Sequence, residues 1–234
     1  MASLSEGPLT EEEYLRIERE AEFKSEFYNG RMYAMAGPAP WRDNELMASL
    51  PESPLLTEEQ YLEIERAAET KSEFHDGRMY AMAGGSFNHA VLSGSIYASL
   101  RNQIPPGCRA LTADLRIKIV AANIYTYADC SVICGEPQLS EDNALNPLLI
   151  AEVLSPSTEG YDHGKKFELY RTIESLREYL LIHQDRRHVE HYSKQDDGSW
   201  VLREHSGVEG LVSIARLGAT VSLGELYAQA LDLT

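Results

Sequence analysis

The sequence has little cysteine and no long hydrophobic run. Its 234 residues include three cysteines and no CxxC pair, which argues against a disulfide framework or a zinc knuckle. We therefore expect Cys108, Cys130 and Cys134 to be reduced thiols in the core. No run of about 18 apolar residues is present, so no transmembrane helix is predicted. The N-terminal stretch MASLSEGPLTEEE lacks the basic start and the apolar run of a signal peptide, which predicts a cytoplasmic protein.

Basic residues are also scarce. The chain has 21 Lys and Arg against 37 Asp and Glu, a net charge of −16. A protein that coats nucleic acid nonspecifically needs a basic surface, and this composition argues against that class. An enzyme needs only a local basic rim, and a site built from carboxylates accepts phosphate once it holds a cation. The acidic balance therefore leaves metal chemistry open.

The N-terminal part contains one duplication. The segment LTEEEYLRIEREAEFKSEFYNGRMYAMAG at 9–37 recurs as LTEEQYLEIERAAETKSEFHDGRMYAMAG at 56–84 with six differences. Nothing after residue 84 resembles this unit, so the pattern is not that of a solenoid. Only the second copy continues directly into the rest of the chain, whereas a proline-containing linker follows the first. We assign residues 1–50 to the duplicated segment and its linker, and 51–234 to the functional domain. Because a shorter loop costs less to close, we expect the second copy to complete that domain.

Periodicity and turn signals predict a mixed fold. Thr57 and Gln60 form a capping-box pattern that begins a helix, and Asp76-Gly77 is typical of a hairpin turn. Apolar residues recur at helical spacing from about Asn88 to Asn102 and alternate with polar ones from 111 to 120, as in a strand. Further strands are expected at 125–134, 148–154, 180–182, 189–192 and 200–202, with a helix at about 163–172 and a turn at Asp197-Gly198. This order predicts an α/β or α+β fold, a mixed β-sheet flanked by helices.

Two acidic residues lie in otherwise uncharged strands. Asp129 is within TYADCSVIC, and Glu152 is within PLLIAEVLS. A carboxylate in such a setting must be paired, hydrogen-bonded, metal-bound or protonated. Because neighbouring strands lie about 4.8 Å apart, two carboxylates on one face can share a divalent ion. The alternative is that each sits at a strand end and accepts backbone hydrogen bonds.

A lysine pair follows these strands. Lys165 and Lys166 are expected in the first turn of the helix at about 163–172, where cations are mildly unfavourable against the helix dipole. A lysine beside two metal-bound carboxylates can position or deprotonate a water for attack on phosphorus. The alternative is a solvated helix face.

Several motifs, taken in their order along the chain, resemble those of one family. The course LTEEQY, SEFHDGRMY, FNHAVLSGSIYASL, YTYADCSVICG, NPLLIAEVLSPSTEGYDHGKKFELY and SLREYLLIHQ is similar to the Uma-type restriction endonucleases of the PD-(D/E)XK nuclease superfamily, over about residues 56 to 195. The resemblance implies a restriction-endonuclease-like sheet and a catalytic centre made of Asp129, Glu152 and Lys166. In this sequence Ala128 replaces the proline usual before the first acid. Leu154 stands where the superfamily lysine is expected, and the motif D-x-G-x-K-F assigns the lysine to Lys166.

Three further residues are candidates for supporting roles. Glu73 is expected where the first helix ends, and a helix acid often supports the metal site in nucleases of this kind; an exposed helix-end residue is the alternative. His89 shares helical spacing with apolar residues, which favours a satisfied, half-buried histidine; a catalytic histidine is the alternative. Asp114 is expected on a strand face with basic residues, so a cross-strand ion pair explains it equally well. His183, His188 and His191 do not form an expected zinc site, because 188 and 191 face opposite sides of one strand.

The leading hypothesis is a metal-dependent endonuclease that hydrolyses DNA phosphodiester bonds. Asp129 and Glu152 are expected to bind Mg²⁺ or Mn²⁺, and Lys166 to assist the nucleophilic water. DNA is the expected partner, and a homodimer suits an enzyme that cuts two strands. The alternative is a catalytically degenerate nuclease-fold protein that binds nucleic acid or protein, since fold alone does not decide function.

Overall fold

The chain divides into two units, residues 1–84 and 85–234. The computed structural model describes residues 25–28, 31–34, 55–68, 71–75, 77–81, 85–155 and 159–233. No helix within these ranges is long and apolar enough to cross a membrane.

A helix and a hairpin make up the described second half of unit 1. Thr57 caps α2 (Glu58–Ala67) through the predicted capping box: its N–H donates to Gln60 Oε1 at 2.8 Å, and its Oγ1 accepts from the Gln60 N–H at 3.3 Å. The helix packs on β3 (Ser72–His75), which pairs with β4 (Arg78–Ala81). Tyr61 stacks on Phe74 with ring centroids 4.8 Å apart. The predicted helix and hairpin are both confirmed.

The two copies of the duplicated segment form the same hairpin. In the first copy, β1 (Ser25–Tyr28) pairs with β2 (Arg31–Ala34) so that Ser25 lies opposite Ala34. In the second copy, β3 and β4 pair in the equivalent register. The rest of the first copy lies outside the described residues. The choice between the copies, like the division at residue 50, therefore stays a prediction.

Unit 2 is built on a six-stranded sheet with the order β14-β13-β12-β11-β8-β5. Only β11 and β12 run parallel; the other neighbouring pairs in this sheet are antiparallel. A parallel pair needs a crossover connection, which contains the helical segment 159–170. The strands are β5 (Cys108–Thr112), β8 (Cys130–Cys134), β11 (Leu149–Leu154), β12 (Glu178–His183), β13 (His188–Lys194) and β14 (Trp200–Ser206).

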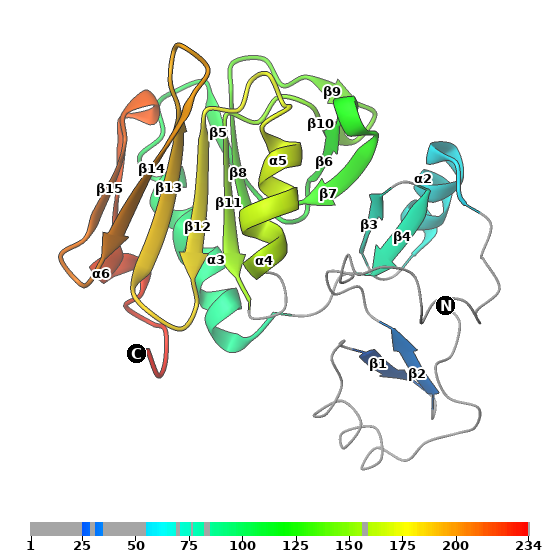
Figure 1. Ribbon diagram of the computed structural model, residues 1–234, viewed down its shortest axis with the longest axis horizontal. Helices are drawn as coiled ribbons and strands as arrows, with labels where there is room; N and C mark the ends of the chain where they lie inside the picture. The colour runs from blue at the N-terminus through cyan, green and yellow to red at the C-terminus, as the bar shows by residue number, and fades with distance from the viewer. Residues whose placement is uncertain are drawn as a thin grey trace. The chain divides into compact units, whose positions relative to one another are not determined.

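Smaller elements flank this sheet (Figure 1). One set of strands has the order β7-β6-β10-β9, and β15 pairs with β16 in a hairpin. These strands are β6 (Arg116–Ile119), β7 (Ile124–Tyr127), β9 (Leu139–Ser140), β10 (Asn143–Ala144), β15 (Leu211–Ile214) and β16 (Ala219–Ser222). The helices are α3 (Phe87–Arg101), α4 (Glu159–Tyr161), the π-helical turn η2 (Asp162–Lys166), α5 (Phe167–Tyr170), α6 (Leu223–Leu226) and the 3-10 turns η1 (Val120–Ala122) and η3 (Ala215–Leu217). The predicted mixed sheet flanked by helices is confirmed.

The central strand β11 divides the core into two clusters. Its side chains alternate between the faces of the sheet. Leu149, Ala151 and Val153 join the cluster that contains residues of α3, α6 and β16. Ile150 and Leu154 join the cluster that contains residues of α5. Glu152 lies midway between Ile150 and Leu154 along the strand, so its side chain projects from the same face as theirs and faces the helical segment 159–170.

The structure corrects three predicted elements. The strand expected at 111–120 is interrupted between β5 and β6, because a turn at 113–114 moves the chain from one set of strands to another. The strand expected at 125–134 is likewise split into β7 and β8, with Asp129 in the break. The helical segment expected at about 163–172 begins at Glu159, so Lys165 and Lys166 are not in its first turn.

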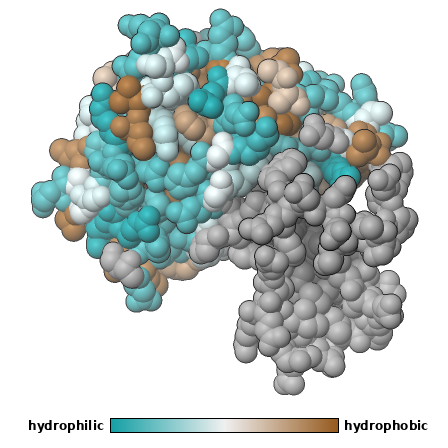
Figure 2. All heavy atoms as spheres, in the orientation of Figure 1, coloured by the Kyte–Doolittle hydropathy of each residue, from teal (hydrophilic) through white to brown (hydrophobic). Residues whose placement is uncertain are grey.

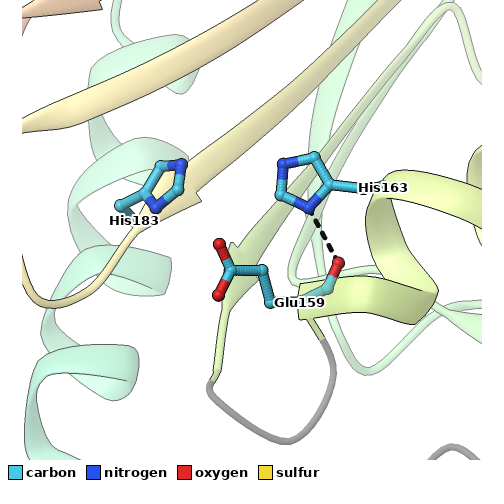
Figure 3. Close-up of side chains that lie close together, drawn as sticks. All are labelled: Glu159, His163 and His183. Carbon is cyan, nitrogen blue, oxygen red and sulfur yellow. Dashed lines mark hydrogen bonds between the residues drawn. The ribbon is translucent and has the colours of Figure 1, made fainter.

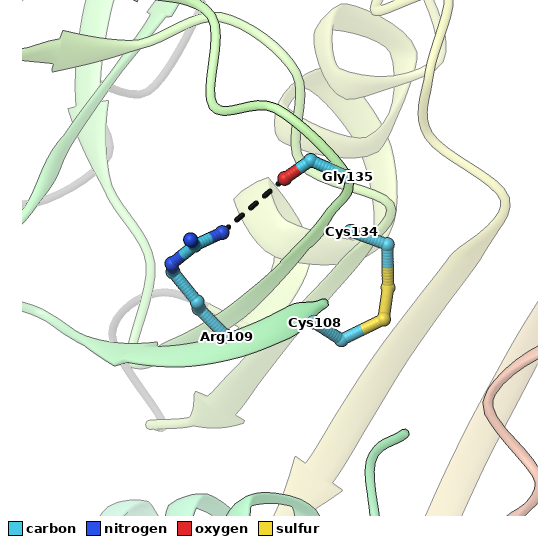
Figure 4. The surroundings of a disulfide bond; sticks show 4 residues. All are labelled: Cys108, Arg109, Cys134 and Gly135. Atoms are coloured by element: carbon cyan, nitrogen blue, oxygen red, sulfur yellow. Dashed lines mark hydrogen bonds between the residues drawn. A yellow bond between two sulfur atoms is a disulfide. The ribbon is translucent and has the colours of Figure 1, made fainter. Parts of the chain in front are cut away.

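The expectation of three reduced thiols is wrong for two of them. Cys108 and Cys134 lie directly opposite each other on β5 and β8 and form a disulfide (Figure 4). The strand register creates this pair, and no local spacing signals it. Cys130 is a free, buried thiol, and burial raises its pKa to about 12.

The surface of unit 2 is mostly hydrophilic on the face shown in Figure 2, with apolar side chains in small groups among polar ones. Exposed large apolar residues include Val120, Leu139, Leu202 and Leu211, which come from four different elements. Apolar burial is therefore concentrated on the two faces of the central sheet, where it stabilises the fold.

Loss of the disulfide is expected to lower stability. The bond closes a loop between residues 26 apart in sequence, and loss of such a constraint costs about 3 kcal/mol in the chain-entropy account. Urea unfolding with and without a thiol reductant measures the effect. Reductant should lower the unfolding midpoint of the wild type and of Cys130→Ala, and leave Cys108→Ser/Cys134→Ser unchanged. An equal midpoint for wild type and double variant would contradict the bond.

Removal of residues 1–46 is expected to leave unit 2 folded. The buried members of both core clusters come from residues 92 to 227, so the deletion removes none of them. Circular dichroism and urea unfolding of the shortened chain measure the outcome, with a deletion of 51–84 as the matched comparison. A shortened chain that fails to fold would show that the first copy is required.

Candidate active site

Glu152 is a buried carboxylate in the central strand. It lies on β11, between β8 and β12, with 4% of its surface exposed. Its Oε1 accepts a hydrogen bond from the Tyr170 hydroxyl at 2.9 Å and lies 2.9 Å from Lys166 Nζ. Because an isolated buried carboxylate is costly, these two contacts make the position tolerable.

Asp129 lies where the chain leaves β7 and enters β8. The antiparallel register pairs Ala151 with Cys130, and one further step along it brings Asp129 opposite Glu152. Directly opposed residues of an antiparallel pair project from the same face. The Asp129 Oδ2 accepts a hydrogen bond from the Val153 N–H at 2.7 Å. The side chain therefore satisfies the backbone at the point where the regular ladder ends.

Lys166 reaches this place from the helical segment. Its Nζ lies between two carboxylates, 2.9 Å from Glu152 Oε1 and 3.6 Å from Asp162 Oδ1. It belongs to the π-helical turn η2 and is buried, and turns of this kind are frequent at functional sites. The neighbouring Lys165 is exposed and pairs with Glu168 at 3.4 Å. The structure thus brings Lys166, and not Lys165, to the strand carboxylate.

Burial and nearby charges together decide the pKa of Glu152. Burial raises the pKa of Glu152 to about 8, although the Lys166 ammonium lowers it; the negative charges of Asp129 and Asp162 raise it further. The carboxyl group therefore holds a proton more tightly than an exposed glutamate does. A second positive charge beside it would favour the ionised form.

His89 contacts the other carboxylate. Its Nε2 lies 3.3 Å from Asp129 Oδ2, and its side chain is half-buried near the start of α3. Burial lowers the pKa of His89, but the hydrogen bond and the charge of Asp129 outweigh it and raise the pKa overall. A Cβ on Gly85 would lie 2.7 Å from His89 Nδ1, so a glycine there leaves room for the imidazole.

Comparisons with known proteins agree with this architecture. Residues 58–223 match the family described as "Uma2: Putative restriction endonuclease". The chain belongs to the Uma2 family. The uncharacterized Synechocystis protein slr1290 is 36% identical over 94% of this chain and 91% of its own length. A second uncharacterized Synechocystis protein, sll1609, is 46% identical over 41% of this chain and 55% of its own length.

A solved structure shows the same fold. It is a crystal structure from Anabaena variabilis, described as a "putative nuclease belonging to DUF820", with a TM-score of 0.59 and 19% identity over 74% of this chain and 98% of that one. The fold of this Uma2-family chain is therefore nuclease-like. Together with the family match, this supports a nuclease as the broad class.

The supporting candidates fall in different places in this Uma2-family chain. Glu73 lies on β3 of unit 1, not at a helix end, and its part in the site stays a prediction. Asp114 is exposed in the turn between β5 and β6, where its Oδ2 accepts from Thr112 Oγ1 at 3.4 Å. It does not share a strand face with Arg116 and Lys118 as expected, because the strand is interrupted there.

Two buried residues at the Uma2-family site were not among the sequence-based candidates. Asp162 is 3% exposed and Tyr170 fully buried, and both contact the Lys166–Glu152 pair. Their signal was their spacing: Asp162, Lys166 and Tyr170 recur every fourth residue, which aligns side chains on one face of a helix. The motif D-x-G-x-K-F also begins with Asp162.

The carboxylate oxygens fit a divalent cation. All contacts given above for Glu152 use Oε1, and those for Asp129 use Oδ2. The second oxygen of each carboxylate takes part in none of these contacts. Carboxylate oxygens are the ligands that Mg²⁺ and Mn²⁺ prefer. The donor chemistry therefore suits the metal that the family implies.

The raised pKa of Glu152 predicts a pH-dependent stability. Its folded-state pKa, about 8, exceeds the ordinary 4.5, so the folded protein binds this proton more tightly than the unfolded chain. That contribution is complete below the ordinary value and is lost as the pH rises to about 8. In this window the free energy of unfolding of the wild type should fall relative to Glu152→Gln, by at most about 1.4 kcal/mol per pH unit.

Urea unfolding between about pH 5 and pH 9 measures this difference. Glu168→Gln, a change at an exposed glutamate of the same helical segment, is the control and should follow the wild-type curve. Parallel curves for the wild type and Glu152→Gln would show that burial does not raise the pKa of Glu152.

Proposed function

We propose that this protein is a metal-dependent endonuclease that hydrolyses DNA phosphodiester bonds. The observation that carries the proposal is the approach of the Lys166 ammonium to Glu152, at 2.9 Å, beside Asp129, which directly precedes the neighbouring strand β8. Two carboxylates and an ammonium in one place suit phosphoryl chemistry, because both the nucleophile and the developing negative charge require positive charge nearby.

Asp129 and Glu152 would hold the cation, Mg²⁺ or Mn²⁺. When bound, the metal supplies a water of lowered pKa and polarises the phosphate. The protein contributes the orientation of the two ligands. The Tyr170 hydroxyl fixes Glu152, and the Val153 N–H with His89 fixes Asp129. Hydrogen bonds to ligating carboxylates are the usual means of orienting them.

Lys166 is proposed to position the attacking water and to stabilise negative charge on phosphorus. Its buried ammonium is held by Glu152 and by Asp162. If Glu152 also held a divalent cation, the Asp162 carboxylate would still hold the lysine near the reacting group. This role for Asp162 is one of positioning.

The DNA substrate is supported by the family match. A chain with a net charge of −16 repels a polyanion overall, so productive binding depends on the cation and on Lys166. We therefore expect activity to require a divalent metal.

Nuclease activity is expected to depend on all three proposed catalytic residues. Asp129→Asn, Glu152→Gln and Lys166→Met should each reduce cleavage of plasmid or oligonucleotide DNA by about 100-fold or more. Lys165→Met, which removes the exposed neighbouring lysine, should stay within about twofold of the wild type, since exposed ion pairs contribute little. Cleavage is measured with Mg²⁺ or Mn²⁺ and with a chelator.

Metal binding is measured separately by thermal unfolding. Mg²⁺ or Mn²⁺ should raise the melting temperature of the wild type, and Asp129→Asn should lose this gain. Equal cleavage by the wild type and Glu152→Gln would remove Glu152 from the mechanism. DNA binding without metal-dependent cleavage would instead favour a degenerate, binding-only protein.

A further inference from the structure

A second group of side chains able to bind a metal lies between the same helical segment and β12, and it does not include the proposed catalytic residues. Glu159 and His163 come from the start of that segment, and His183 comes from the end of β12. Figure 3 shows the three side chains turned toward one another. One ligand atom from each lies within 4.8 Å of the other two.

A buried carboxylate supports this group. Glu190 on β13 lies with Oε1 2.7 Å from His163 Nε2 and 3.0 Å from His183 Nε2. The Tyr192 hydroxyl donates to its Oε2 at 3.1 Å. Both imidazoles therefore converge on one carboxylate, which brings two histidines from different elements together.

The hydrogen bonds of His163 require its imidazole ring to be positively charged. Its Nδ1 lies 2.8 Å from the Glu159 backbone oxygen, which only accepts. Its Nε2 faces the Glu190 carboxylate, which also only accepts when ionised. Both nitrogens must then carry hydrogen, so His163 is an imidazolium. In agreement, hydrogen bonds to Glu190 and Glu159 raise the pKa of His163 although burial lowers it.

His183 offers a nitrogen to the same group. Its Nε2 donates to Glu190, whereas its Nδ1 makes no hydrogen bond to any residue that the structure describes. Histidine ligands of metals commonly donate their other N–H to a carboxylate, which orients the ring. In the same way, Glu190 accepts the N–H of His183, and the Glu159 backbone carbonyl accepts the Nδ1–H of His163.

We propose that Glu159, His163 and His183 bind a zinc-type divalent ion. The ligands are the Glu159 carboxylate, His163 Nε2 and His183 Nδ1. On binding, the ion replaces the proton on His163 Nε2, which passes to solvent, and Glu190 keeps the hydrogen bond from His183. Zinc bonds of about 2.1 Å separate tetrahedral ligands by about 3.4 Å. One ligand atom from each residue already lies within 4.8 Å of the others, and binding of the ion also requires Glu190 Oε1, now 2.7 Å from His163 Nε2, to move away from that nitrogen.

The ligand types separate this ion from the catalytic metal. Two imidazoles and one carboxylate suit Zn²⁺, whereas an all-carboxylate site suits Mg²⁺ or Mn²⁺. The group is also open to solvent on one side, because Glu159 is exposed and the His163 side chain is 29% exposed, while His183 is buried. The ion would tie the helical segment that carries Lys166 to the end of β12.

Isothermal titration calorimetry of the full chain with ZnCl₂ tests this site. One Zn²⁺ per chain is expected, and His163→Gln should weaken its affinity by about 100-fold or more. His183→Gln and Glu159→Gln should also weaken it. Because His163 is the most exposed of the histidines in this group, its variant is the decisive one, with circular dichroism to show that it is folded. Co²⁺ in place of Zn²⁺ should give visible absorption bands that the His163→Gln protein lacks.

The control for histidine loss is His205→Gln. His205 lies opposite Val189, so it faces the other side of the sheet from Glu190, and its loss should leave Zn²⁺ affinity unchanged. Asp129→Asn should also keep Zn²⁺ binding, whatever the outcome for cleavage. No Zn²⁺ binding by the wild type, equal binding by His163→Gln, or loss of binding in Asp129→Asn would each overturn the proposal.

Discussion

The architecture of unit 2 depends on a carboxylate placed in the middle of its sheet. Glu152 lies on β11, whose six residues are all buried, and a charge at such a position is costly unless it is paired. Lys166 and Tyr170 supply the partners, and both come from the helical segment that connects β11 to β12. The crossover that the parallel pair requires is thus also the element that carries the counter-charge. Stability and proposed chemistry depend on the same contact.

The second constraint is the break between β7 and β8. In a continuous strand, Asp129 would be a regular member of the hydrogen-bonded ladder, and its carboxylate would not be needed to accept a backbone N–H. Instead the chain changes from one set of strands to another at Asp129, whose carboxylate accepts the Val153 N–H. The backbone of β11 therefore stays satisfied beyond its regular pairing, and Asp129 comes beside Glu152. His89 reaches the same carboxylate from α3, which covers the opposite face of the sheet.

The helical segment 159–170 serves two groups of polar residues. Lys166 and Tyr170 contact the strand carboxylate Glu152, and Asp162 contacts Lys166. His163 points instead to Glu190 on β13. The π-helical turn that contains both Lys166 and His163 changes the usual angular spacing of side chains. An ion bound by His163 and a cation bound by Glu152 would both contact this one short segment. This places a proposed structural ion next to a proposed catalytic one.

Local patterns in the sequence determined several of the elements, although not the breaks at 113–114 and at Asp129, and they singled out the two strand carboxylates. The capping box at Thr57, the turns at Gly77 and Gly198, and the apolar run of β11 depend on interactions within a few residues, so they are legible without the fold. Lys166 was identified through a motif. Only tertiary structure decided the Cys108–Cys134 bond, the approach of His89 to Asp129 and the meeting of His163 with His183. Strand register and crossover bring these pairs together, and neither is encoded in the spacing of the residues along the chain.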